Sequence, residues 1–441
     1  MKYRLVIILL CIYGFFKEFR PITSFLSKFL TTVKGFPVEV LSTRIYWIWS
    51  VANFLFTIPI VLFTDYLNFK PILIIEALAL IGTGIFLVFG RTLFEIQLTQ
   101  VTYGLGTASE IAYMSYLYTI VPETEIGLVT GVVRAVVLIS KSMANIFAQF
   151  SYSFQWVSLD DLNNITLIGS VVAFPFVVMA VLAHPTKQQP SQEEVIFDER
   201  NDSQSGLREV CDDSRISNVM NHIYHQFTTS FVSDDRKIQL TWCVWWIVVS
   251  GCVMQMYNFI QVLWEIIEAK DSKLKNGLVE FINNILGAVV TLIFSRCQVN
   301  WKNHTKLITT TSTLLISGAF LVLASTQTLY VSYVAYIAAN LIYSFSIAVA
   351  STVLATVSPQ LSIGFVFGII SLLASVLQII LNTLFFTNPW VTFSQSQSFV
   401  FYSGICAIFS VIFFLISQTK ELSAPNDSSQ VEDSCDSLIV P

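Results

Sequence analysis

The sequence consists largely of apolar stretches, each long enough to cross a lipid bilayer as a helix. A transmembrane helix needs about 20 mostly apolar residues. Stretches that meet this requirement lie at residues 4–30 (interrupted at Arg20-Pro21), 45–64, 71–89, 93–121, 126–152, 163–183, 238–266, 277–295, 307–325, 329–357, 362–387 and 397–417. The pattern predicts an all-α membrane protein with twelve transmembrane helices.

Composition supports this prediction. The chain is 54% hydrophobic and only 12% charged, whereas about 25% of the residues of a soluble domain are charged. The formal net charge is −5 and no stretch is strongly basic, so no nucleic-acid partner is expected. The apolar N-terminus continues to Leu30 without an A-x-A-like cleavage site. We therefore expect a first transmembrane span there rather than a signal peptide.

A polar segment divides the stretches into two groups of six. Residues 184–237 contain runs of Gln, Ser, Asp and Glu with few aromatics, which predicts a mostly disordered linker. The expected domains are an N-terminal six-helix bundle (1–183), a cytoplasmic linker (184–237), a C-terminal six-helix bundle (238–417) and a disordered cytoplasmic tail (418–441). With both termini in the cytoplasm, 13 Lys and Arg residues fall on the inner side and 8 on the outer side, as the positive-inside rule requires.

Ionisable side chains at membrane depth are costly, so each is a candidate functional residue. Glu110 lies in the middle of its predicted helix and follows a run of small residues, and Tyr113 lies one turn further on. Since positions i and i+3 share a helix face, both side chains are expected to point into one cavity. A carboxylate beside an aromatic ring suits a flat cationic ligand. The alternative is that Glu110 forms a structural salt bridge with Arg134 or Lys141 on the next helix.

Other polar residues have two interpretations each. Asn258 and Gln261 form a polar helix face that could bind a ligand or join helices. Trp49 is either an aromatic-belt residue at the membrane interface or a stacking wall, and periodicity favours the belt. Arg134 and Glu280 are candidates for a charge network or for ion coupling, although Glu280 could also face interfacial water. Glu76, early in its helix, is expected near the cytoplasmic interface.

No catalytic constellation is present in the sequence. There is no G-x-x-x-x-G-K-[ST] loop for a nucleotide, and no Ser or Cys nucleophile has a His nearby in sequence. The seven cysteines form no C-x-x-C pair and the four histidines fall in loops. We therefore expect no enzyme activity, no cofactor and no metal site.

The layout of six helices, a linker and six helices resembles the major facilitator superfamily. Within it, the chain resembles the family of reduced folate carriers and thiamine transporters over about residues 5–417. The resemblance rests on the order and spacing of short motifs: Tyr13-Gly14-Phe15-Phe16, Arg20-Pro21, Thr64-Asp65-Tyr66-Leu67, Lys70-Pro71, Glu110-Ile111-Ala112-Tyr113, Ser115-Tyr116, Arg134, Trp245-Trp246, Leu263-Trp264, Asn276-Gly277, Glu280, Leu286-Gly287-Ala288 and Val366-Phe367-Gly368.

The resemblance implies a vitamin substrate. An acid at position 110 resembles the thiamine carriers, whereas the folate carriers have arginine there, and Gln378 stands where they have lysine. The positions of Tyr113, Trp49, Asn258 and Gln261 also resemble the thiamine site. Thr23 departs from the family pattern, which has an acid there, and Lys17-Glu18 is an unusual charged pair.

Three hypotheses follow from these observations. The favoured one is a plasma-membrane carrier of thiamine or a related cationic heterocycle that works by alternating access. Glu110 would pair with the cation, Tyr113 and Trp49 would stack on its rings, and Asn258 and Gln261 would bind its polar edge. The alternatives are a folate carrier of the same fold and a transport-inactive membrane receptor or scaffold.

Overall fold

The computed structural model of the chain describes residues 2–67, 69–121, 126–183, 235–268, 275–296, 299–358, 363–387 and 393–421. Every regular element within these ranges is helical. The expected linker, 184–237, lies outside the described residues except for its last three positions. The expected tail, 418–441, lies outside them beyond Glu421, where the final helix ends.

A helix occupies each of the twelve predicted stretches. The long helices are α1 (Lys2–Glu18), α4 (Tyr46–Leu67), α5 (Phe69–Phe89), α6 (Leu93–Ile120), α7 (Ile126–Ser153), α8 (Leu159–Ala183), α11 (Arg236–Ile267), α12 (Asn276–Arg296), α13 (Thr305–Ser325), α14 (Leu329–Val357), α15 (Ile363–Asn382) and α16 (Gln395–Glu421). Within the described residues, seven helical segments are long and apolar enough to span a membrane by composition alone, and Asn276–Val290 is a shorter apolar helix.

The first span is broken where the sequence predicts an interruption. Helix α1 ends at Glu18, and a 3-10 turn, η1 (Pro21–Phe25), begins at the proline. Proline lacks a backbone N–H and cannot continue an α-helix without a kink. A short α-helical segment, α2 (Leu26–Lys28), and a π-helical turn at Phe29–Val33 complete the span. The break exposes backbone groups of η1 and α2 to contacts from α11, described below.

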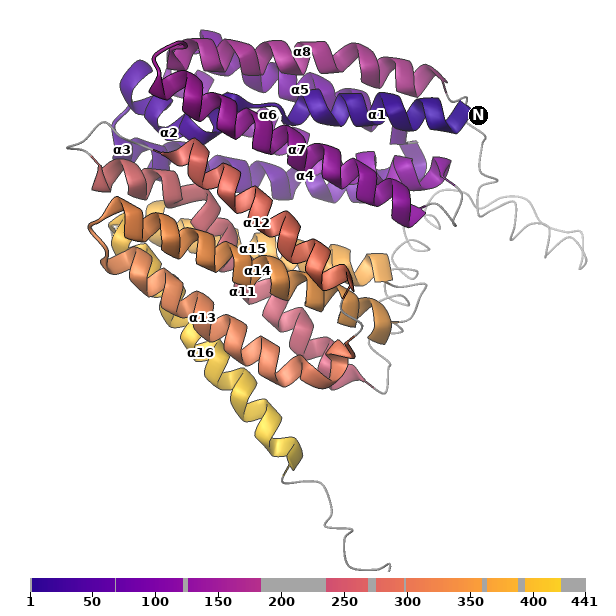
Figure 1. Cartoon of the computed structure of the whole chain (residues 1–441), viewed down its shortest axis with the longest axis vertical. Helices are drawn as coiled ribbons and strands as arrows, with labels where there is room; N and C mark the ends of the chain where they lie inside the picture. The colour runs from indigo at the N-terminus through magenta and orange to yellow at the C-terminus, as the bar shows by residue number, and fades with distance from the viewer. Residues whose placement is uncertain are drawn as a thin grey trace, which may run out of the picture.

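The helices form two groups, α1–α8 and α11–α16, which lie side by side (Figure 1). The closest packing is within each group, between α5 and α6 in the first and between α13 and α16 in the second. Successive long helices run in opposite directions, so the start of α1, the end of α8 and the start of α11 lie at one end of the molecule (Figure 1). We call this the linker end and the opposite end the far end.

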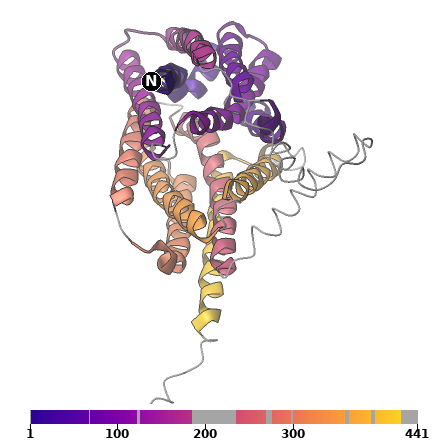
Figure 2. The same cartoon turned by 90° about the vertical axis from the view of Figure 1, so that its right-hand side faces the viewer.

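The two groups meet mainly at the far end. The most extensive packing between them joins α7 to α12, where Gly277 permits a close approach: a Cβ atom there would lie 2.6 Å from the backbone oxygen of Asn145. The Leu278 N–H donates to Gln149 Oε1 nearby, at 3.3 Å. Toward the linker end, the helices of the second group slope away from those of the first (Figures 1 and 2). The structure is therefore joined at the far end and spread at the linker end.

Candidate functional site

A cavity of about 320 Å³ lies within the first group of helices, and α11 of the second group forms its remaining wall. Its wall includes Trp49, Asn258 and Gln261, three of the five predicted binding residues, together with Arg20, Thr23 and Tyr103. These side chains come from the broken first span, α4, α6 and α11. A cavity at the contact between two helical halves is where carriers with this arrangement hold their substrates.

Trp49 forms an aromatic wall of this cavity. Its ring stacks on Tyr103, with centroids 6.1 Å apart and planes inclined by 30°. The indole Nε1–H donates to Thr107 Oγ1 at 3.1 Å, and the Thr107 hydroxyl donates in turn to Asn53 Oδ1 at 3.0 Å. These bonds fix the orientation of the indole. Of the two interpretations that the sequence allows, the position of Trp49 in the cavity wall fits the stacking role.

Asn258 and Gln261 line the cavity and also join the two halves. The Gln261 side-chain amide donates to the backbone oxygen of Thr23 at 2.9 Å, and its Oε1 accepts a bond of 3.4 Å from the Ser27 N–H. The Asn258 amide donates to Ser50 Oγ at 3.2 Å. The Thr23 oxygen also accepts the 3-10 bond from the Leu26 N–H, so Gln261 uses its second lone pair. In this conformation both amides act across the contact between halves.

Glu110 has a cationic partner on the first span. Its Oε1 lies 3.8 Å from the Lys17 Nζ, and 49% of the Glu110 side chain is exposed. Lys17 is almost fully buried and lies 2.6 Å from Glu76 Oε1. The predicted alternative of a Glu110–Lys141 salt bridge is wrong, because the Lys141 ammonium pairs with Glu18 at 3.5 Å. The side chain of Arg134, on α7, lies outside the described part of the chain.

Two further expectations are corrected by this cluster. Glu76 is buried within the helix bundle beside Lys17 and does not face interfacial water; a buried ammonium requires a paired anion. Neither Glu110 nor Tyr113 lines the cavity, and the two side chains do not point into one common space. Tyr113 is buried, its hydroxyl donates to the Leu10 carbonyl at 3.0 Å, and its ring centre lies 4.4 Å from the Lys17 Nζ. Tyr113 and Glu110 are thus joined through Lys17.

One face of α6 connects Glu110 with the cavity. Tyr103, Thr107 and Glu110 are spaced i, i+4 and i+7, so they lie on one side of the helix. Seven residues correspond to about 10 Å along the axis. Glu110 therefore lies on the cavity face of α6, about two turns from Tyr103 toward the linker end.

A second cluster of charges lies at the start of the break in the first span. Arg20 Nη2 is 2.7 Å from Glu18 Oε2, and the Arg20 guanidinium lies 5.2 Å from the centre of the Tyr103 ring. Glu18 is also the partner of Lys141, whose side chain is 44% exposed. This cluster places one carboxylate between two cations.

In the second half, Glu280 belongs to a polar network with the neighbouring helix. The Tyr336 hydroxyl donates to Glu280 Oε1 at 2.8 Å. One turn away, the Asn340 amide donates to Asn283 Oδ1 at 2.5 Å, and Tyr257, which lines the cavity, donates to Asn340. Hydrogen bonds therefore link the α12–α14 contact that holds Glu280 to the cavity wall.

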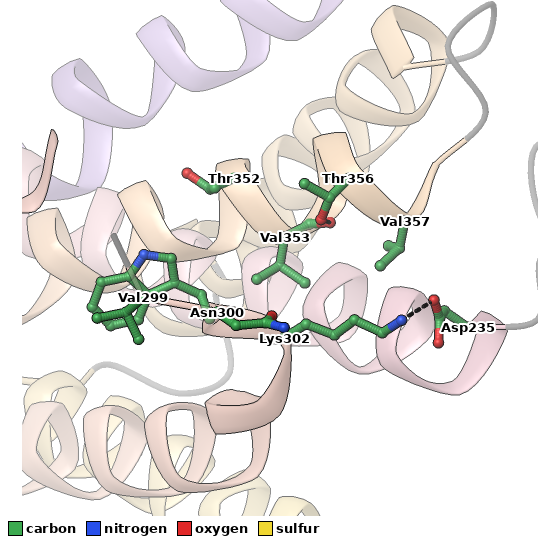
Figure 3. Close-up of a pocket in the computed structure, with 9 residues that line it drawn as sticks. Asp235, Val299, Asn300, Lys302, Thr352, Val353, Thr356 and Val357 are labelled. Carbon is green, nitrogen blue, oxygen red and sulfur yellow. Dashed lines mark hydrogen bonds and ion pairs between the residues drawn. The ribbon is translucent and has the colours of Figure 1, made fainter. Parts of the chain in front are cut away.

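A separate cavity of about 230 Å³ lies at the linker end (Figure 3). It is formed by the start of α11, the segment before α13 and the end of α14, and it includes Thr352 and Thr356. Its two charged groups, Lys302 and Asp235, pair with each other at 2.5 Å. It contains none of the predicted site residues.

Sequence reasoning missed Lys17, Glu76 and Arg20 as members of the site. Each is an ionisable residue within or beside a predicted span. Listing opposite charges at similar depth on different spans would have identified Lys17 as a possible partner of Glu110 and Glu76. Tyr103 had no such signal, since the sequence is rich in aromatics throughout.

Solved structures of membrane transporters share this fold. The POT family transporter PepTSo superimposes with a TM-score of 0.66 at 10% identity, covering 96% of this chain and 99% of that one. The inward-open xylose transporter XylE from E. coli gives 0.64 at 11% identity, covering 94% and 96%. The chain therefore shares the fold of these transporters, and the predicted twelve-helix, six-plus-six architecture is confirmed.

Sequence comparison identifies the family. The reduced folate carrier family matches residues 1–401, so the chain belongs to this family, as its motifs predicted. Folate transporter 1 of Caenorhabditis elegans is 30% identical over 427 residues, which cover 95% of this chain and 93% of the relative. Human thiamine transporter 1 is 26% identical over 467 residues, covering 97% and 93%. These relatives are transporters, and the chain is a transport protein rather than an enzyme.

Proposed function

We propose that this protein carries thiamine or a closely related cationic heterocycle by alternating access. The observation that carries the proposal is the environment of Glu110. Its neighbour Lys17 already has Glu76 at 2.6 Å, so the three groups together retain one negative charge. The exposed half of the Glu110 side chain presents that charge. A cationic ligand is attracted to such a group, whereas a folate dianion is repelled.

The aromatic wall supports the same class of substrate. The stacked pair of Trp49 and Tyr103 offers flat π surfaces on the face of α6 that also carries Glu110. A heterocyclic cation gains both stacking and cation–π attraction at such a wall. The substrate would lie with its rings at Trp49 and its positive charge toward Glu110.

Transport would occur by rocking of the two halves, residues 1–183 and 238–417, about the cavity. With both termini in the cytoplasm of a plasma-membrane carrier, the linker end faces the cytosol and this conformation is inward-facing. The bonds of Gln261 and Asn258 across the far end would then break when the carrier opens to the outside.

A folate substrate is the second candidate, because a relative named folate transporter 1 is 30% identical and Arg20 lines the cavity. A folate carboxylate could pair with Arg20 or with the exposed part of Lys141. Against this, Arg20 already pairs with Glu18 at 2.7 Å, which removes much of its attraction for an anion.

The test is uptake of radiolabelled thiamine and folate, measured side by side in cells that express the wild type or Glu110→Gln. The proposal expects saturable thiamine uptake that Glu110→Gln abolishes. Glu39→Gln is the matched control, because Glu39 is an exposed acid outside the cavity and should leave uptake unchanged. Folate uptake that survives Glu110→Gln would instead establish the folate carrier, and binding of either vitamin without flux would establish a receptor.

A further inference from the structure

Lys17 has two acidic neighbours at unequal distances. The Nζ atom is 2.6 Å from Glu76 Oε1 and 3.8 Å from Glu110 Oε1. The Lys17 and Glu76 side chains are 2% and 1% exposed, whereas that of Glu110 is 49% exposed. The deeper acid thus holds the ammonium by a direct hydrogen bond, and the acid open to a ligand does not.

We propose that Glu76 determines the substrate charge that this carrier accepts, by holding Lys17 away from Glu110. The inference rests on the proposed function, since it concerns how Glu110 keeps its negative charge for a cation. Glu76 does not touch the substrate. It is a positioning residue that acts through Lys17.

The physical basis is competition between two carboxylates for one ammonium. Coulomb attraction increases as the distance falls, and strongly so where water is excluded. A buried ammonium that loses its partner is severely destabilised and must find another anion or lose its proton. The lysine side chain is flexible and its charge is compact, and Glu110 lies 3.8 Å away. Without Glu76, Lys17 would neutralise Glu110 from within the protein and displace the cationic substrate.

The contacts around Lys17 allow this movement. Its ammonium lies 4.4 Å from the centre of the Tyr113 ring and 5.5 Å from that of Tyr13, and both rings can accommodate a cation over their faces. The Tyr113 ring is fixed by the bond of its hydroxyl to Leu10. A shift of Lys17 toward Glu110 therefore exchanges one carboxylate for the other while the aromatic contacts are retained.

The charge of the three-residue cluster gives the expected ranking of variants. The wild type carries one net negative charge. Glu76→Gln leaves the cluster neutral, and the double variant Lys17→Met/Glu76→Gln restores one negative charge on Glu110 alone. Loss of the buried ion pair alone would impair both variants. The proposal instead predicts that only Glu76→Gln weakens the binding of a cation.

The experiment measures the KM of thiamine uptake, with the rate normalised to the amount of carrier at the cell surface. Glu76→Gln is expected to raise KM at least about tenfold, and the double variant is expected to return it to within about threefold of the wild type. Inhibition by 3-deazathiamine, in which carbon replaces the charged ring nitrogen, serves as the matched control. Its inhibition constant should be unchanged by Glu76→Gln, because its ring carries no positive charge for Glu110 to attract. A merely structural defect would weaken the binding of both ligands equally.

Three outcomes decide the matter. An unchanged KM in Glu76→Gln, or an equal loss for the neutral analogue, overturns the inference while leaving Glu110 as the cation site. If Glu76→Gln does not reach the membrane, a raised KM in the double variant overturns it, and a KM near that of the wild type supports it. Wild-type cells that do not take up thiamine, or Glu110→Gln cells that do, overturn the proposed function itself.

Discussion

The side-chain amide of Gln261, on α11, donates a hydrogen bond of 2.9 Å to the backbone oxygen of Thr23, in the break of the first span. This bond joins the two halves of the carrier beside the cavity. The 3-10 turn η1 bonds the Thr23 oxygen to the Leu26 N–H. This leaves the Ser27 N–H, and the second lone pair of the Thr23 oxygen, for Gln261. The residue that lines the cavity therefore also contributes to closing the far end.

Gln261→Ala should shift the carrier toward a conformation open at the far end. The substitution removes the bonds to Thr23 and Ser27, each worth about 0.5–1.5 kcal/mol. Labelling of Thr23→Cys by a membrane-impermeant thiol reagent added from the far side should then become roughly threefold to tenfold faster. Thr23→Cys keeps the backbone acceptor.

Gln100→Ala is the matched control for this labelling. Gln100 also lines the cavity, but its amide donates to Thr99 within α6 and does not cross to the other half. Equal labelling rates in the Gln261→Ala and Gln100→Ala backgrounds would show that the Gln261 bonds do not hold the far end closed.

Trp49→Ala should raise the KM for thiamine about tenfold, because it removes the stacking surface opposite Tyr103. Trp49→Phe should have a smaller effect, roughly threefold, since it keeps an aromatic face and loses the hydrogen bond to Thr107. Uptake at varied thiamine concentrations provides the comparison. Trp156→Ala is the control, because Trp156 is 74% exposed and lies outside the cavity; equal effects of Trp49→Ala and Trp156→Ala would exclude the proposed wall.

The positions of the spans could be predicted from the sequence because hydrophobic length determines them. Helix α6, for instance, covers Leu93–Ile120 where residues 93–121 were expected. Glu110 could be recognised for the same reason, as a charge within an apolar stretch. Both conclusions depend on local sequence and on the bilayer, and neither requires knowledge of how the helices pack.

The contacts between helices could not be predicted in the same way. Glu110 and Tyr113 are about 60° apart around α6, which is enough for one side chain to be exposed and the other to be buried against α1. Sequence spacing gives the angle between them but not the rotation of the helix relative to its neighbours. The pairing of Lys17 with Glu76 spans 59 positions and depends entirely on that rotation.

Gly277→Ala should slow transport by preventing full closure of the far end. A methyl group there would meet the Asn145 backbone oxygen at 2.6 Å, and α7 and α12 would have to move apart. We expect the maximal uptake rate per surface carrier to fall about tenfold with a smaller change in KM. Gly318→Ala, where nothing lies within 4 Å of the added atom, should leave the rate unchanged, and a matching loss there would point to a general effect of alanine on helices.

Gly14→Ala should destabilise the first half through Tyr113. The new Cβ atom would lie 2.9 Å from the Tyr113 hydroxyl oxygen, and overpacking of this kind costs about 1–3 kcal/mol. Tyr113→Phe removes the clashing oxygen, although it also loses the bond to the Leu10 carbonyl. The double variant Gly14→Ala/Tyr113→Phe should therefore unfold at a higher temperature than Gly14→Ala alone. Thermal unfolding of the purified carrier in detergent measures this directly. Strictly additive destabilisation by the two substitutions would mean that a side chain at position 14 does not clash with the Tyr113 hydroxyl.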